Sequence, residues 1–69
     1  MHQHDCDRLI DGRKADDICG TSRTKRYELM ARGEFPVPVK LGKSVRYSMR
    51  ECHEWVAARI AERDTKAGA

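Results

Sequence analysis

Several features are scarce in this sequence, and each scarcity excludes a class of protein. With 69 residues, the chain has room for one small domain, so a multidomain enzyme is excluded. No apolar run approaches the roughly 18 residues that a membrane helix needs. The N-terminus also lacks the basic start and apolar stretch of a signal peptide. We therefore expect a cytoplasmic protein with no membrane partner.

Cysteine is sparse and irregularly spaced. The three cysteines, Cys6, Cys19 and Cys52, fit neither a disulfide framework nor a CxxC metal motif. We interpret them as free thiols, with Cys19 and Cys52 acting as small apolar side chains. The histidines and the cysteine of segment 1–6 suit a transition metal, but a disordered terminus is the preferred interpretation. The sequence thus predicts neither a metal site nor a cofactor.

Positive charge is concentrated in the middle of the chain. Residues 1–22 carry three basic and five acidic side chains, residues 23–50 eight and two, and residues 51–69 three and four. These counts give net charges of −2, +6 and −1. A basic zone flanked by acidic segments is typical of a surface that binds a polyanion, and we predict a nucleic-acid partner.

Local signals predict two short helices around a turn. Asp11 is placed to cap a helix that extends to about Cys19, and Ser22 to cap a second helix that ends before Gly33. Between them, Gly20-Thr21 predicts a tight turn. Two short helices joined by a glycine-containing turn are typical of a helix-turn-helix.

A hairpin and a third helix are predicted after the helix-turn-helix. Gly42-Lys43 suits a two-residue turn, and Leu9-Ile10 is long enough for an edge strand only. Ser48-Met49-Arg50-Glu51 has the pattern of a capping box, and the helix that it opens places Trp55 as an anchor of the core. Alternation predicts that one face of the hairpin packs (Val39, Leu41, Val45, Tyr47) and that the other is basic and faces outward (Lys40, Lys43, Arg46).

Basic side chains at the start of the second helix conflict with helix stability. The positive end of the helix dipole disfavours cations there, whereas a phosphate is attracted by the dipole, the free N–H groups and the cations together. Arg26 is expected to lay its stem over the core while its head reaches a phosphate. We predict phosphate contacts for Arg23 and the basic hairpin residues, and base contacts for Thr24, Lys25 and Glu28. The full predicted set is Ser22, Arg23, Thr24, Lys25, Arg26, Tyr27, Glu28, Lys40, Lys43, Ser44 and Arg46.

Three stretches carry a resemblance to a known family: residues 20–30, residues 33–42, and Val45-Arg46-Tyr47 followed by Trp55-Val56. The most specific is the FP-x-P-x-x-LG connection that begins at Phe35. On these stretches, residues 9–63 resemble the AlpA and excisionase-like DNA-binding proteins of prophages and integrative elements. These are small winged-helix proteins related to the MerR DNA-binding domain.

The resemblance agrees with a mainly α fold with a small β-hairpin, a winged helix-turn-helix. We expect the DNA-binding domain at 7–63, between disordered ends at 1–6 and 64–69. The resemblance implies that the helix from Ser22 enters the major groove of duplex DNA and that the hairpin at Gly42-Lys43 is the wing. It implies an excisionase (recombination directionality factor), a transcriptional regulator, or both. Its partners are then DNA, an integrase and adjacent copies of itself; no enzymatic activity or small-molecule ligand is expected.

The sequence departs from the family pattern at four positions. Gly12 and Thr21 stand where apolar residues are usual, Arg26 where Ile or Val is usual, and Glu28 where Arg is frequent. A carboxylate at position 28 accepts a hydrogen bond from a cytosine amino group and is repelled by phosphate. An alternative from another class is a protein-interaction module of the anti-repressor type, whose basic face binds an acidic protein. The response to salt distinguishes the two: affinity for DNA falls steeply as the ionic strength rises, whereas affinity for a specific protein partner falls less.

Overall fold

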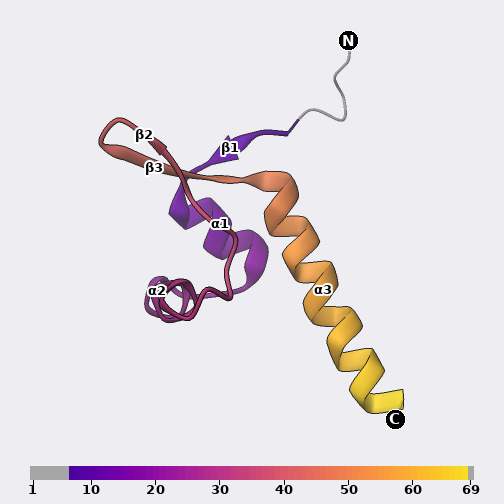
Figure 1. Cartoon of the computed structure of the whole chain (residues 1–69). Coiled ribbons are helices and arrows are strands. Elements are labelled where there is room, and N and C mark those ends of the chain that lie inside the picture. The colour runs from indigo at the N-terminus through magenta and orange to yellow at the C-terminus, as the bar shows by residue number, and fades with distance from the viewer. Residues whose placement is uncertain (1–6, 69) are drawn as a thin grey trace.

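The computed structural model describes residues 7–68, which form three helices and three short strands (Figure 1). In chain order these are β1 (Leu9–Ile10), α1 (Gly12–Cys19), α2 (Arg23–Ala31), β2 (Val39–Leu41), β3 (Ser44–Ser48) and α3 (Met49–Gly68). The fold is the predicted winged helix-turn-helix: α1 and α2 form the helix-turn-helix, and β2 and β3 form a hairpin that we call the wing. Segment 1–6, predicted to be disordered and considered as a metal ligand set, lies outside the described residues.

Side chains at the starts of α1 and α2 make the predicted capping hydrogen bonds. Oδ1 of Asp11 accepts from the backbone N of Lys14 at 2.9 Å, and Oγ of Ser22 accepts from the backbone N of Lys25 at 3.1 Å. Each bond satisfies an N–H group that has no acceptor inside its own helix. Gly20 ends α1 with a φ of 69°, a left-handed conformation that favours glycine. The turn after it directs the chain into α2.

The start of α3 is capped by two segments of the chain. Oγ of Ser48 accepts from the backbone N of Glu51 at 3.0 Å, as in a capping box. The carboxylate of Asp7 accepts from Ser48 Oγ and, at 2.9 Å, from the backbone N of Arg50. These hydrogen bonds hold the pKa of Asp7 below its ordinary value, and the bond from Ser48 has the largest effect. The helix extends to Gly68, into segment 64–69, which the sequence predicted to be a disordered tail.

The sheet has the order β1-β3-β2, and both pairs of strands are antiparallel. Gly42 and Lys43 form the predicted two-residue turn, because Leu41 pairs with Ser44 across it. The φ of Gly42 is 62°, which this type of turn requires at its first central residue. β1 adds to the other side of β3 and ties the N-terminal segment to the wing strand.

The predicted division of the wing into a packed face and a basic face is wrong. The two-residue turn pairs Lys40 with Val45 and Val39 with Arg46, so each pair places one basic and one apolar side chain on the same face. The wing also projects from the body of the protein (Figure 1), and residues 39–45 are all exposed. Of the four side chains predicted to pack, Tyr47 is buried, whereas Val39, Leu41 and Val45 are exposed.

The core lies where the sheet meets the three helices. Phe35 packs edge-to-face on Tyr47, with ring centroids 5.8 Å apart, and lies 5.4 Å from the ring of Trp55. Trp55 is at the margin of the core, partly buried, and its Nε1 donates to the backbone oxygen of Glu34 at 2.8 Å. The buried apolar residues are Ile10, Ala15, Leu29, Phe35, Tyr47 and Cys52.

Candidate nucleic-acid interface

α2 exposes most of the residues that the sequence predicted as DNA contacts. Its core side is formed by Leu29, which is buried, and Met30, which packs against the core. On the outer side, Nζ of Lys25 lies 3.8 Å from Oε1 of Glu28. Both partners are exposed, so solvent screens this pair strongly and it restrains them little. The exposed predicted residues of this segment are Ser22, Arg23, Thr24, Lys25, Tyr27 and Glu28.

Arg26 is the exception among the predicted contacts of α2. Only 7% of it is exposed, and its Nε lies 2.6 Å from Oδ1 of Asp16 in α1. Its Nη1 donates to the hydroxyl of Tyr47 in β3 at 3.1 Å. Burial lowers the pKa of Arg26, but the bonds to Asp16 and Tyr47 outweigh burial and raise the pKa above its ordinary value. The guanidinium is thus occupied inside the protein rather than reaching a phosphate as predicted.

Further polar groups surround the same guanidinium. Oγ1 of Thr21 donates to Oδ1 of Asp16 at 3.0 Å, so one carboxylate oxygen holds both the turn and α2. At Gly12 the guanidinium takes up the space that a side chain would need. We call this group, which joins α1, the turn, α2 and β3, the Arg26 hub: Gly12, Asp16, Thr21, Arg26 and Tyr47.

Tyr27 lies at the surface close to two guanidinium groups. Its ring centroid is 5.0 Å from Cζ of Arg26 and 5.9 Å from Cζ of Arg23, within the roughly 6 Å over which cation–π attraction acts. Half of the residue, 51%, is exposed. A buried cation and an exposed cation therefore hold an aromatic ring on the outer side of α2.

A shallow depression separates α2 from the wing. Arg23 and Tyr27 line it from α2, and Lys40 and Val45 line it from the wing. Arg13, at the start of α1, also belongs to its lining. Basic side chains from three elements therefore surround one concave surface.

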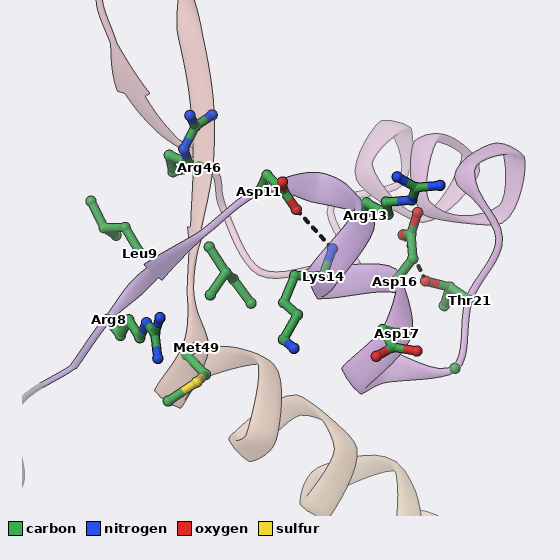
Figure 2. Close-up of a pocket in the computed structure, with 12 residues that line it drawn as sticks. Arg8, Leu9, Asp11, Arg13, Lys14, Asp16, Asp17, Thr21, Arg46 and Met49 are labelled. Carbon is green, nitrogen blue, oxygen red and sulfur yellow. Dashed lines mark hydrogen bonds between the residues drawn. The ribbon is translucent and has the colours of Figure 1, made fainter.

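Arg46 belongs to the opposite face of the wing from Lys40. It is partly buried, and its Nη1 donates to the backbone oxygen of Val45 at 3.0 Å. Figure 2 shows Arg46 beside a second depression, between β1 and the start of α1. Lys43 and Ser44 are exposed at and next to the tip of the wing. The predicted wing contacts are therefore distributed over both faces and the tip.

Sequence reasoning missed three basic residues at this second depression, because segment 1–22 has a net charge of −2. Two acidic residues of that segment are engaged within the protein, since Asp11 caps α1 and Asp16 binds Arg26. Asp11, Asp16 and Asp17 line this depression together with its basic residues, so both signs of charge meet there. The adjacent basic residues Arg13 and Lys14, in the first turn of α1, were the feature of the sequence that could have indicated basic side chains at this surface. The missed residues, which line the depression with Arg46 (Figure 2), are Arg8, Arg13 and Lys14.

Cys19 and Cys52 lie together where α1 meets α3. Sγ of Cys19 donates to the backbone oxygen of Cys52 at 3.9 Å, and both are free thiols, as predicted. Burial raises the pKa of Cys19 to about 12 and also raises that of Cys52. Within residues 7–68, no group of three His, Cys, Asp or Glu side chains is arranged to hold a metal ion. No helix in the same range is long and apolar enough to cross a membrane.

Comparison with known proteins identifies a family. Residues 8–60 match the family described as prophage CP4-57 regulatory protein (AlpA). The chain is also similar to an uncharacterized protein, ORF88, of Enterobacteria phage P4, with 49% identity over 47 residues. That match covers 67% of the chain and 53% of the phage protein, about half of its length. No solved structure matches the chain. Because the family match spans the helix-turn-helix, the wing and residues 49–60 of α3, the chain belongs to the AlpA family of prophage regulatory proteins.

Proposed function

We propose that the protein is a sequence-specific DNA-binding regulator of a prophage or integrative element. In this proposal α2 lies in the major groove, and the wing lies on the adjacent groove or backbone. Membership of the AlpA family supports the regulatory role, and the winged helix-turn-helix supports binding to duplex DNA. The activity needs no catalysis, cofactor or small-molecule ligand.

The observation that carries the proposal is the exposed, basic start of α2. Arg23 and Lys25 are exposed in its first turn, which holds no acidic residue. In water alone, each cation at this end of a helix costs about 0.3–1 kcal/mol against the dipole. A phosphate reverses that balance, because the dipole, the free N–H groups and the cations all attract it. A polyanion at the start of α2 explains the arrangement better than solvent does.

The proposed contacts divide into those that position DNA and those that read it. Arg46 on one face of the wing and Arg13 at the start of α1 add cations, and Ser22, Tyr27 and Ser44 add hydroxyl groups. Thr24, Lys25 and Glu28 contact base edges, where the Glu28 carboxylate accepts from a cytosine amino group. Arg26 is no longer among the contacts, because the hub occupies its guanidinium. The main phosphate contacts are Arg23, Lys40 and Lys43.

Within this role we favour a recombination directionality factor that also regulates transcription. One recognition helix and one wing span too few base pairs for high specificity. Several copies therefore bind adjacent sites, bend the DNA and act together with an integrase. Sedimentation with a multi-site duplex tests this: cooperative binding of several copies supports it, and independent binding at each site contradicts it.

A second candidate is a protein-interaction module of the anti-repressor type. The observation that favours it is the apolar surface of the wing, where Val39, Leu41 and Val45 are exposed beside basic side chains. Apolar side chains ringed by charge suit a protein partner. Binding to such a partner survives added salt and heparin better than binding to DNA does.

Selection from random duplexes, followed by fluorescence anisotropy, tests the proposed function. The protein is expected to enrich a defined motif and to bind it more tightly than scrambled DNA. Binding should fall steeply as salt rises, should be displaced by heparin and should persist with a chelator. Failure to bind any duplex at low salt, or loss of binding with the chelator, contradicts the proposal.

A further inference from the structure

The Arg26 hub connects the elements of the proposed DNA-binding surface. Asp16 comes from α1, Thr21 from the turn, Arg26 from α2 and Tyr47 from β3, the strand that forms one side of the wing. Three hydrogen bonds join them, at 2.6 Å from Arg26 to Asp16, 3.1 Å from Arg26 to Tyr47 and 3.0 Å from Thr21 to Asp16. Among the hydrogen bonds of the described residues, only the bond from the Arg26 guanidinium to Tyr47 links α2 to the wing strand through a charged group.

The geometry of the hub is restrained by burial. Arg26 is 7% exposed and Tyr47 is 1% exposed, so water does not replace a hydrogen bond that is lost between them. The Tyr47 hydroxyl is also engaged on its other side, where it donates to Sδ of Met30 in α2 at 3.3 Å. A rotation of α2 against β3 would break bonds to a buried charge, which is costly. The hub therefore resists changes in the angle between α2 and the wing.

We propose that Arg26 is a positioning residue: through Asp16 and Tyr47 it sets the angle between α2 and the wing, and it does not itself contact DNA. The inference rests on the proposed DNA-binding function and names the residues that hold its geometry. α2 and the wing must meet base edges and the neighbouring backbone at the same time. An error in their angle therefore weakens binding to the specific site more than binding to random DNA, because base contacts need the stricter geometry.

Two hub variants and one contact variant separate positioning from contact. The double variant Asp16→Asn/Arg26→Gln removes one charge of each sign, so the net charge stays the same. Tyr47→Phe removes only the hydroxyl that joins the hub to β3 and keeps the buried ring. Arg23→Gln is the control, because it removes an exposed cation at the start of α2. Binding of each protein to the wild type's selected duplex and to a scrambled duplex is measured over a range of salt concentrations.

Both hub variants are expected to lower the ratio of specific to non-specific affinity about tenfold and to leave the salt dependence unchanged. Arg23→Gln is expected to weaken binding to both duplexes and to reduce the slope of log affinity against log salt by about one unit. A purely structural hub would lower the thermal midpoint but leave the affinity ratio unchanged. Circular dichroism identifies the folded variants, and Tyr47→Phe carries the test if the double variant does not fold.

Two results overturn the proposal while the proposed function stands. One is a slope for Asp16→Asn/Arg26→Gln that falls by about one unit, as for Arg23→Gln, which would make Arg26 a phosphate contact. The other is an unchanged affinity ratio in the folded hub variants. A wild-type protein that binds neither duplex overturns the proposed function, and this inference with it.

Discussion

The guanidinium of Arg26 lies so close to Gly12 that a methyl group at position 12 would stand 2.7 Å from Nη2. Thr21 donates to the same Asp16 oxygen that binds this guanidinium. Gly12, Thr21 and Arg26 are three of the four positions at which the sequence departs from the pattern of the AlpA-like proteins that it resembles. The structure brings these three residues together in one polar cluster.

Gly12→Ala is expected to lower the free energy of unfolding by about 1–3 kcal/mol. The added methyl group displaces the guanidinium from Asp16 and Tyr47, which leaves buried polar groups without partners. In an Arg26→Met background the same substitution should be nearly neutral, since the obstructing group is gone. Denaturant unfolding of the four proteins of this cycle measures the coupling, and additive effects would contradict the assigned contact.

Ser22→Asp is expected to preserve the fold and to weaken DNA binding. Aspartate caps a helix as well as serine does and suits the helix dipole, so the thermal midpoint should not fall. Its carboxylate would repel a phosphate at the start of α2, and we expect a loss of affinity of about tenfold or more. Ser22→Ala is the control: it should cost about 1 kcal/mol of stability and weaken DNA binding less. Unchanged affinity in Ser22→Asp would mean that no phosphate lies there.

Asp7 should stabilise the cap of α3 in a pH-dependent way. Its pKa is lower in the folded protein than the ordinary value of 3.8. Its contribution is therefore fully present above that value and is lost as the pH falls through the folded-state pKa. The thermal midpoint of Asp7→Asn should lie below that of the wild type at neutral pH, and the gap should close in acid below pH 3.8. A gap that does not change with pH would contradict the assigned cap.

The two inner thiols should be unreactive in the folded protein. Burial raises the pKa of Cys19 to about 12 and raises that of Cys52, and the thiolate is the form that reacts. In a Cys6→Ser variant, which leaves only these two, mass spectrometry should detect slow alkylation by iodoacetamide at neutral pH. Denaturant should make alkylation fast. Rapid modification without denaturant would contradict the packing of α1 against α3.

Features set by neighbouring residues could be predicted from the sequence. Asp11 and Ser22 cap helices through N–H groups three positions later, and Gly42 supplies the positive φ of a two-residue turn. The role of Arg26 depends instead on Asp16, ten positions away, and on Tyr47, twenty-one positions away. Nothing within α2 indicates these partners, so the first-turn pattern suggested an outward contact.

The wrong prediction of a packed face and a basic face for the wing has a simpler cause. A two-residue turn places Leu41 opposite Ser44, so odd-numbered residues of β2 share a face with even-numbered residues of β3. Counting across the turn would therefore have separated Lys40 from Arg46 at the sequence level. The exposure of Leu41 could not be predicted in this way, because it depends on how far the wing projects from the body (Figure 1).

The most direct test of the account measures the affinity of Lys43→Ala and Glu28→Ala for a panel of single-base variants of the selected site, at two salt concentrations. Lys43→Ala should weaken binding to every duplex alike and reduce the salt slope by about one unit, because in the proposed function the wing tip contacts phosphates. Glu28→Ala should relax the preference at particular base pairs by about 1–3 kcal/mol, because in the proposed function α2 contacts base edges. A wing variant that alters base preference, together with a helix variant that only lowers overall affinity, would contradict the roles assigned to α2 and the wing.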